Sequence, residues 1–295
     1  MSGLIDTAAL TRRRISDPGE IVRAWHDRRR GSYPDDGRLM IVAADHPARG
    51  ALGVRDNASA MASRRDLLDR LAIALSRPGV DGVLGTADIL EDLLLSGLLE
   101  GRIVIGSMNR GGLQGAEFEF DDRWTGYDAD TIAANGLDGG KMLTRICLAD
   151  EYTATTLESS GRAVTALARH QLMAMVEPFL SVRVDSQRVR NLLDPDSVIK
   201  SIQIASGLGA SSAFTWLKLP VVEDMGRVLE STTLPSLLLG GDAGGDPEEH
   251  YRQWADALRF PSAAGLVIGR ALLYPADGDV AGAVDTTVRL VHHQP

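Results

Sequence analysis

Cysteine is nearly absent from this chain of 295 residues, in which Cys147 is the only one. A single thiol excludes an internal disulfide framework and suits a reducing environment, so we expect a cytoplasmic protein. The sequence also lacks any apolar run close to the roughly 18 residues that a membrane-spanning helix needs. Its first residues lack the apolar segment of a secretory signal. We therefore expect a protein that works away from the membrane.

Positive charge is also in short supply. The formal net charge is −9 at pH 7, which argues against a surface that binds nucleic acid. Only three of the 31 basic residues are lysines, so arginine supplies almost every cation. Lys218 nevertheless lies inside the apolar segment TWLKLP, where burial of an ammonium group is costly. Lysine, unlike arginine, can lose its proton when buried and become an amine nucleophile, so Lys218 is a candidate catalytic residue.

The spacing typical of metal ligands is missing as well. The chain has six histidines, but we find no cluster of them with the spacing of a catalytic metal site. His46 directly follows Asp45, and we interpret it as a loop histidine or a hydrogen-bonding histidine. We therefore expect chemistry that needs no metal ion and no cofactor.

The sequence does contain a regular alternation of strand and helix. Short apolar segments rich in β-branched residues recur and are separated by turns and helical patterns. They cover residues 38–46, 79–87, 101–109, 139–148, 171–179, 213–220, 234–244 and 264–273. Eight such units are typical of an α/β fold, the (β/α)8 TIM barrel. The alternative is an open doubly wound sheet, but the glycine-rich dinucleotide turn of that fold does not follow the first segment. We expect an N-terminal helical extension at residues 1–37 and the barrel at residues 38–295.

Charged residues collect at the ends of the predicted strands, where barrel enzymes have their active sites. Asp45 follows the first strand, Glu177 ends the fifth, and Lys218 lies on the sixth. Lys141 and Arg145 are four residues apart on the fourth strand, so both side chains can point into the barrel. Each residue considered alone could have another role. Asp45 could stabilise a turn, Glu177 could form an ion pair, and Lys218 could contact a phosphate group. Together they favour a nucleophilic lysine whose pKa is lowered by burial and by a neighbouring cation.

Glycines follow the last two predicted strands. Gly240 and Gly241 end the seventh, and Gly269 with Arg270 ends the eighth. Backbone N–H groups of glycine can approach an anion closely, and phosphate sites are frequent at this place in the fold. Tight turns between strand and helix also use paired glycines. We predict that these four residues hold a phosphate group.

Four segments resemble class I aldolases of the family that holds deoxyribose-phosphate, tagatose-bisphosphate and archaeal-type fructose-bisphosphate aldolases. AADHPARGAL, with Asp45 and Arg49, is similar to the first-strand motif of the tagatose-bisphosphate branch, and GGKMLTRI resembles its fourth strand at Lys141. MVEP matches the fifth-strand glutamate at Glu177, and GLGASSAFTWLKLPV resembles the strand with the Schiff-base lysine, here Lys218. The resemblance implies that Lys218 forms a Schiff base and that Glu177 and Lys141 belong to the active site.

The resemblance also implies a substrate. Arg145 stands where the tagatose-bisphosphate branch tends to have uncharged residues, which suggests an additional anionic group. Barrels of a similar type occur in actinobacterial inositol-catabolism clusters, where the implied substrate is a phosphorylated 5-dehydro-2-deoxygluconate. Its carboxylate would suit Arg145. The implied function is therefore a lyase of carbohydrate metabolism that releases dihydroxyacetone phosphate and malonate semialdehyde.

Two other functions remain open at this point. A phosphosugar isomerase or lyase could use Glu177 as a base without a covalent intermediate, and a non-catalytic barrel could bind a sugar phosphate. In each case we expect a small sugar phosphate as the partner and a homo-oligomer as the assembly. The loop at residues 110–127, which is rich in aromatic residues, is predicted to be a lid or an interface; its aromatic residues are Phe118, Phe120, Trp124 and Tyr127.

Overall fold

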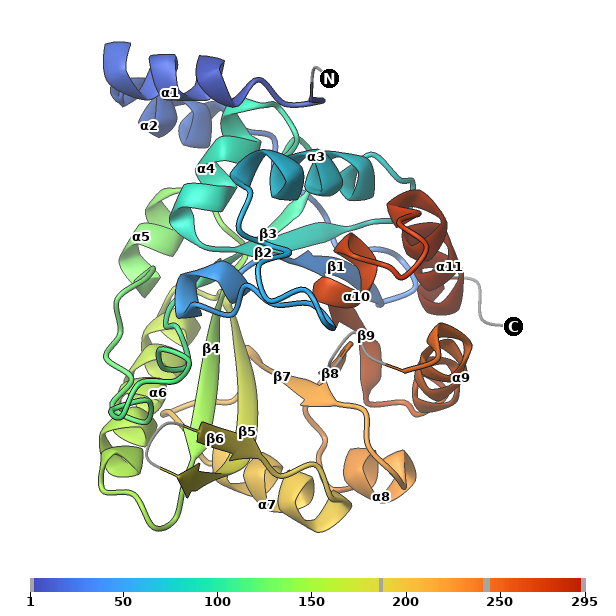
Figure 1. Ribbon diagram of the computed structural model, residues 1–295. Helices are drawn as coiled ribbons and strands as arrows, with labels where there is room; N and C mark the ends of the chain where they lie inside the picture. The colour runs from blue at the N-terminus through green and yellow to red at the C-terminus, as the bar shows by residue number, and fades with distance from the viewer. Residues whose placement is uncertain (1–2, 186–187, 241–244, 293–295) are drawn as a thin grey trace.

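A closed barrel of parallel strands forms the centre of the computed structural model, which describes residues 3–185, 188–240 and 245–292 (Figure 1). Within these residues the sheet has nine strands in the order β4-β3-β2-β1-β9-β8-β7-β5-β6, and a further pairing of β4 with β5 closes the ring. The strands are β1 (Leu39–Ala43), β2 (Gly82–Gly85), β3 (Ile103–Ser107), β4 (Gly139–Ile146), β5 (Met173–Asp185), β6 (Arg188–Asn191), β7 (Thr215–Pro220), β8 (Ser236–Leu239) and β9 (Ala263–Ile268). The predicted (β/α)8 TIM barrel is confirmed.

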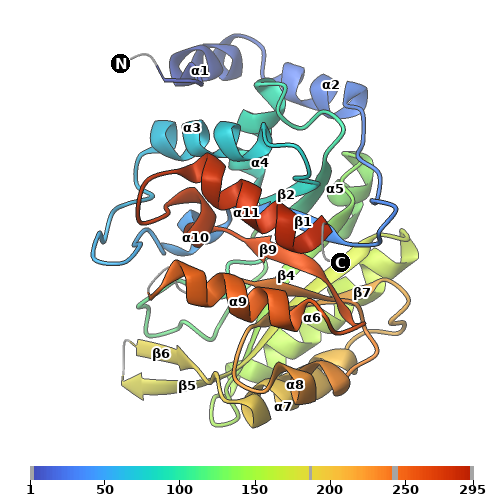
Figure 2. The same cartoon turned by 90° about the vertical axis from the view of Figure 1, so that its right-hand side faces the viewer.

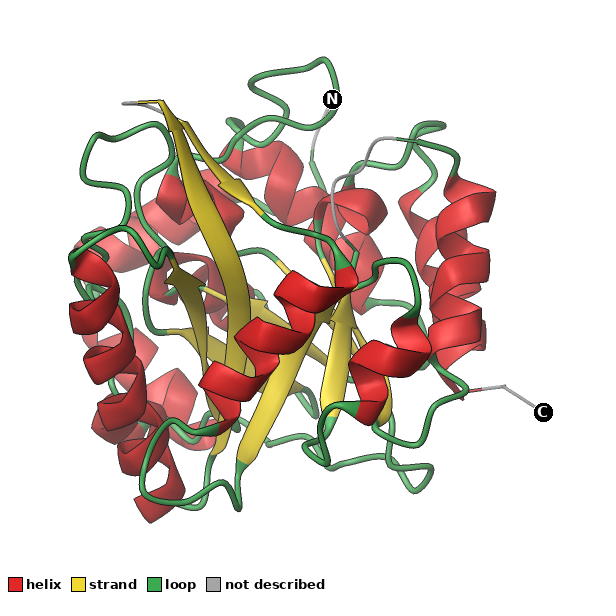
Figure 3. Cartoon of the chain, turned by 90° about the horizontal axis from the view of Figure 1, so that it is seen from below, coloured by secondary structure: helices red, strands yellow, loops and turns green. Residues whose placement is uncertain are grey.

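Helices surround the strands on the outside of the barrel, as Figure 2 and Figure 3 show from two further directions. They are α1 (Thr7–Ser16), α2 (Gly19–Asp27), α3 (Arg64–Leu75), α4 (Ala87–Leu95), α5 (Ala129–Ala134), α6 (Tyr152–Arg169), α7 (Pro195–Ser206), α8 (Met225–Glu230), α9 (Pro247–Ala257), α10 (Arg270–Leu273), α11 (Val280–His292) and the 3-10 helix η1 (His46–Arg49). No helix in these segments combines the length and the apolar character that crossing a membrane requires.

The alternation of side chains along the strands divides the hydrophobic core into two parts. On β1, Leu39, Ile41 and Ala43 belong to the cluster inside the barrel, whereas Met40 and Val42 pack with the surrounding helices. The interior side chains become smaller toward the carboxyl end of β1, where Ala43 is the last residue. Parallel strands that are buried on both faces explain why the strand segments read as almost continuous apolar runs.

The structure corrects two predicted strand ends. The fifth strand does not stop at residue 179 but runs on to Asp185, and it pairs antiparallel with β6, which the sequence analysis did not predict. This hairpin projects beyond the ring of helices (Figure 2). The eighth predicted strand ends at Ile268, because the segment Arg270–Leu273 forms the short helix α10. Both corrections lie at the carboxyl end of the barrel and therefore shape the site described below.

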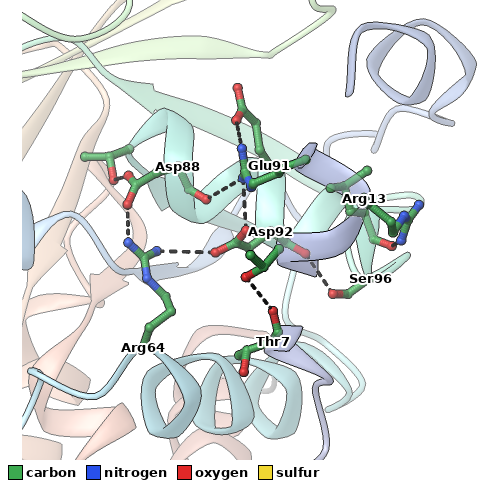
Figure 4. A network of polar contacts seen from close by, with 11 residues as sticks. Thr7, Arg13, Arg64, Asp88, Glu91, Asp92 and Ser96 are labelled. Atoms are coloured by element: carbon green, nitrogen blue, oxygen red, sulfur yellow. Dashed lines mark hydrogen bonds and ion pairs between the residues drawn. The ribbon is translucent and has the colours of Figure 1, made fainter. Parts of the chain in front are cut away.

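The N-terminal helices α1 and α2 pack beside α4 at one side of the barrel (Figure 1). Figure 4 shows the polar network at this contact, in which α4 presents three carboxylates. Arg14 of α1 lies 2.9 Å from both Glu91 and Asp92, and Arg64, at the start of α3, pairs with Asp88 and also lies 3.7 Å from Asp92. The ion pairs thus link α1, α3 and α4 at this side of the barrel.

Candidate active site

The carboxyl ends of the barrel strands open into a cavity of about 910 Å³. The cavity is lined by residues of the barrel strands, among them Ala43, Leu143, Glu177, Lys218, Leu239 and Val267. The β5–β6 hairpin contributes Val184, Val189, Arg190 and Asn191. Barrel enzymes carry their catalytic residues at this end, because the loops after the strands converge there. The hairpin adds a wall to one side of the cavity.

Four predicted catalytic residues meet at one side of this cavity. Lys141 Nζ lies 2.8 Å from Asp45 Oδ2 and 2.7 Å from Glu177 Oε2. The other oxygen of Glu177, Oε1, lies 3.1 Å from Lys218 Nζ. The strands β4, β5 and β7 are direct neighbours in the barrel, which explains why the two lysines flank one glutamate. Lys141, Glu177 and Lys218 are each less than a tenth exposed.

The side-chain alternation on β4 is the one that the sequence predicts. Lys141 and Arg145 form ion pairs inside the barrel mouth, and Leu143 lines the cavity. Thr144 points outward, where its hydroxyl lies 3.0 Å from the hydroxyl of Ser160 on α6. Both cations of this strand therefore face the site.

The two lysines differ in their electrostatic environment. Burial lowers the pKa of Lys218 below its ordinary value; the carboxylate of Glu177 opposes this shift, and the ammonium group of Lys141 reinforces it. Burial alone would also lower the pKa of Lys141, but the carboxylates of Asp45 and Glu177 raise it above its ordinary value. Lys141 is therefore held as a cation, whereas Lys218 is the lysine that more readily becomes a neutral amine.

The two carboxylates are held in their ionised form. Burial alone would raise the pKa of Asp45 and of Glu177, but the ammonium groups of Lys141 and Lys218 lower both pKa values below their ordinary range. Buried charges persist when they are paired in this way. The cluster thus offers one fixed cation, one titratable amine and two carboxylates that can accept protons.

The predicted phosphate side contains Gly240, Gly269 and Arg270, which all line the cavity. A Cβ atom at Gly269 would lie 2.5 Å from the carbonyl oxygen of Ala43, and one at Gly240 would lie 2.7 Å from Ile268 Cγ2. Neither position has room for a side chain without a shift of its neighbours, which favours glycine at both. Gly241 lies outside the described residues.

Arg145 has a partner that the sequence analysis missed. Its guanidinium forms an ion pair with Glu119, which also accepts a hydrogen bond from Arg49 Nη2 at 3.4 Å. Glu119 belongs to the loop at residues 110–127 and is buried. The loop has no strand or helix periodicity that would point to this residue. Arg145 is thus oriented toward the cavity, as predicted, but a carboxylate of the protein already occupies one side of it.

His46 lies at the start of η1 and lines the cavity beside Asp45. Burial lowers the pKa of His46 to about 4; Asp45 opposes this shift, and Arg270 reinforces it. The imidazole is therefore neutral at physiological pH. Its Nδ1 atom is buried, lies 3.8 Å from Asp45 Oδ1, and has no hydrogen-bond partner within the described segments.

The inner side of the loop at residues 110–127 forms part of the cavity wall. Gln114, Gly115 and Glu119 line the cavity, and Phe120 and Tyr127 are buried against the barrel. Phe118 is more than half exposed. The loop therefore borders the site, and its roles as a lid or as an interface stay predictions.

In the part of the chain that the structure describes, no group of three or more His, Cys, Asp and Glu side chains could hold a metal ion. The lysines and carboxylates named above suit covalent chemistry on a carbonyl group, because an amine whose pKa is lowered by burial lies beside a carboxylate that can move protons.

Comparisons with known proteins agree with this architecture. The Cgl0159-like family model matches residues 37–288. The crystal structure of Cgl0159 from Corynebacterium glutamicum superposes with a TM-score of 0.95, at 54% identity over 99% of each chain. A Schiff base forming fructose-1,6-bisphosphate aldolase superposes with a TM-score of 0.63 at 16% identity, covering 92% of this chain and 100% of that chain. An archaeal fructose 1,6-bisphosphate aldolase has the same TM-score and identity, covering 93% and 100%. None of the curated protein sequences matches this chain.

Proposed function

The chain belongs to the Cgl0159-like family, and we propose that it is a class I aldolase that cleaves a phosphorylated keto sugar through a Schiff base on Lys218. One observation carries the proposal: Lys218 Nζ lies 3.1 Å from Glu177, whose other oxygen lies 2.7 Å from the ammonium group of Lys141. The barrel fold, shared with aldolases at low identity, supports the same class of reaction.

Formation of the Schiff base begins with the neutral amine of Lys218. Its nitrogen forms a bond to the carbonyl carbon of the substrate, and the carbonyl oxygen takes up a proton from water to give a carbinolamine. Glu177 lies within hydrogen-bond distance of Lys218 Nζ, so it can accept the proton that the nitrogen loses and deliver it to the departing hydroxyl. Water then leaves, and a protonated imine remains on Lys218.

Cleavage of the carbon–carbon bond uses the imine as an electron sink. Glu177, again a carboxylate, removes the proton of the hydroxyl group whose carbon becomes the aldehyde. The electron pair of the broken bond moves onto the imine as an enamine. Protonation of the enamine and hydrolysis then release the second product and restore Lys218.

Lys141 is assigned to positioning and electrostatics, not to nucleophilic attack. Two carboxylates raise its pKa, so its nitrogen carries a proton and has no lone pair to offer. Its charge also helps to lower the pKa of Lys218. Asp45 fixes Lys141 in place and can accept a hydrogen bond from a substrate hydroxyl. Gly240, Gly241, Gly269 and Arg270 are assigned to the phosphate group of the substrate.

The specific substrate that we propose is a phosphorylated 5-dehydro-2-deoxygluconate, which would give dihydroxyacetone phosphate and malonate semialdehyde. Support comes from the sequence resemblance to barrels of inositol-catabolism clusters and from the cationic side chains in the cavity. Arg145 is the residue that we assign to the carboxylate of the sugar acid.

Borohydride inactivation tests the reaction class. Class I chemistry predicts that borohydride inactivates the protein only when dihydroxyacetone phosphate is present, and that EDTA leaves turnover unchanged. Insensitivity to borohydride with turnover intact would favour an isomerase or lyase that uses Glu177 as a base. Stabilisation by the sugar phosphate without turnover would favour a binding protein.

A further inference from the structure

Glu119 holds two arginines of the cavity wall at once. Its carboxylate forms an ion pair with Arg145 and accepts a hydrogen bond from Arg49 at 3.4 Å. The side chains of Glu119 and Arg145 are less than a tenth exposed, and that of Arg49 is 18% exposed. All three residues line the same cavity as Lys218. The group therefore lies inside the candidate active site and not on the outer surface.

Two guanidinium groups share Glu119 as their ion-pair partner, while the carboxylates of Glu177, Asp45 and Asp122 also act electrostatically on Arg49. The Nε atoms of Arg49 and Arg145 are both buried and have no hydrogen-bond partner within the described residues. A buried N–H donor without a partner is destabilising, and an arginine fork is best matched by a carboxylate that binds two of its N–H groups. The arginines thus have unused capacity for an anion.

The position of Arg145 in the barrel separates it from the predicted phosphate site. Around the ring, β4 carries Arg145 and β9 leads into Gly269 and Arg270, and four strand steps lie between β4 and β9 in either direction. The two cationic regions therefore lie on opposite sides of the barrel mouth. A substrate with an anionic group at each end could span the cavity past Lys218.

We propose that Arg49 and Arg145 form the binding site for a carboxylate of the substrate, and that Glu119 occupies this site until the substrate displaces it. The proposal deepens the aldolase function above, on which it rests for the identity of the other half of the substrate. A carboxylate is the favoured anion because the group that now fills the site is itself a carboxylate. Glu119 would thereby select a keto sugar acid over a sugar that carries two phosphate groups.

The loop around Glu119 supplies a local reporter of this displacement. The second carboxylate oxygen of Glu119 accepts a hydrogen bond from the backbone N–H of Gly115 at 3.1 Å. The neighbouring residue Gln114 donates its own N–H to the carbonyl of Arg49 at 2.9 Å, which anchors the loop independently of Glu119. Displacement of Glu119 therefore frees the amide of Gly115 while the loop stays attached.

Isothermal titration with 3-hydroxypropionate, an unreactive carboxylate, tests the proposal. Glu119→Gln removes the competing charge and keeps the size of the side chain, so it should bind the probe about tenfold more tightly than the unaltered protein. Arg145→Met should weaken binding by about the same factor. Glu117→Gln, an exposed glutamate of the same loop, should leave the affinity unchanged. The neutral 1,3-propanediol should not distinguish between the variants.

Equal or weaker binding to Glu119→Gln, compared with Glu117→Gln, would overturn the proposal, because Glu119 would then only support the loop. If Glu119→Gln does not fold, amide exchange of the unaltered protein decides the matter. Exchange at Gly115 should become faster when 3-hydroxypropionate binds, and slower exchange would contradict displacement. A phosphate probe, glycerol 3-phosphate, that gains as much as the carboxylate from Glu119→Gln would overturn the assignment to a carboxylate.

The binding test does not depend on Lys218 and therefore separates two kinds of failure. If borohydride trapping fails while Glu119→Gln binds the carboxylate more tightly, only the aldolase reaction is wrong. If trapping succeeds while Glu119→Gln binds no better, only the carboxylate site is wrong.

Discussion

Lys218 Nζ lies 3.1 Å from Glu177 Oε1, and both side chains are buried at the mouth of the barrel. The pairing brings an amine with a lowered pKa within reach of an ionised carboxylate. A carbinolamine needs these two groups, because its nitrogen must lose a proton and its hydroxyl must gain one. The pair therefore carries the chemical part of the proposed function.

Replacement of Glu177 by glutamine should reduce kcat about 10²–10⁴-fold, because an amide of the same size cannot take up the proton. Steady-state kinetics with the phosphorylated keto sugar as substrate would measure the change in kcat. KM should change much less, since the substituted amide keeps a hydrogen bond to Lys218. The exposed Glu117→Gln serves as the matched control and should keep its kcat. A Glu177→Gln enzyme with kcat within a few-fold of normal would exclude Glu177 as the acid and base.

Replacement of Lys141 by methionine should shift the acidic limb of the kcat/KM profile to higher pH. The reactive form of Lys218 is the neutral amine, so the rate rises as pH passes its pKa. The ammonium group of Lys141 helps to lower that pKa, and its loss also leaves Glu177 free to stabilise protonated Lys218. We expect a shift of about one pH unit or more, as is usual when a neighbouring charged group is removed from a buried site. An unchanged limb in a folded variant would show that Lys141 does not tune Lys218.

His292, at the end of α11, should make stability depend on pH. Hydrogen bonds to Asp81, at 3.1 Å, and to Asp36, at 2.7 Å, raise the pKa of His292 to about 9, against the opposing effect of burial. The folded state thus binds the proton more tightly, so this contribution is fully present below about pH 6.5 and is lost as pH rises through about 9.

The measurement is urea denaturation of His292→Gln at about pH 6 and about pH 9.5, on either side of this window. The variant should lose about 1 kcal/mol of unfolding free energy at the lower pH, a value reduced for the partial exposure of Asp36, and little at the higher pH. His26→Gln is the control, because the side chain of His26 is almost fully exposed. A loss that is equal at both pH values would mean that His292 acts by packing and not by charge.

Trp25 on α2 should contribute strongly to attachment of the N-terminal helices. The residue is 4% exposed and belongs to the main hydrophobic cluster. Trp25→Ala should therefore cost about 3–5 kcal/mol of unfolding free energy. Val22→Ala, on the exposed side of the same helix, should change it by less than about 0.5 kcal/mol. Similar losses in both variants would contradict burial of α2 through Trp25.

The sequence predicts the barrel and the inward direction of its charged side chains, and both predictions have a physical reason. Strands that are covered on both faces are apolar along almost their whole length, so the eight strands stand out in the sequence as apolar segments. Once the strands are known, the two-residue period places Lys141 and Arg145 on the same inner face. The meeting of Asp45, Glu177 and Lys218 follows because all strands of a parallel barrel end at the same side.

Two parts of the site, the hairpin of β5 with β6 and the buried Glu119, do not follow from the pattern of apolar runs. The segment SVRVD at the end of β5 alternates apolar and polar residues, which is typical of an exposed hairpin strand and is visible in the sequence. Glu119 is different. It lies in an irregular loop, 26 residues before Arg145 in the chain, and only the folded arrangement brings the two together.

Peptide mass mapping after borohydride reduction with dihydroxyacetone phosphate tests the central claim most directly. The account predicts a stable adduct on the peptide that contains Lys218, its loss in Lys218→Arg, and its retention in Lys141→Arg. An adduct on Lys141 would keep the reaction class but reverse the assignment of the two lysines. Absence of any adduct, with binding of dihydroxyacetone phosphate demonstrated, would contradict Schiff-base chemistry in this barrel.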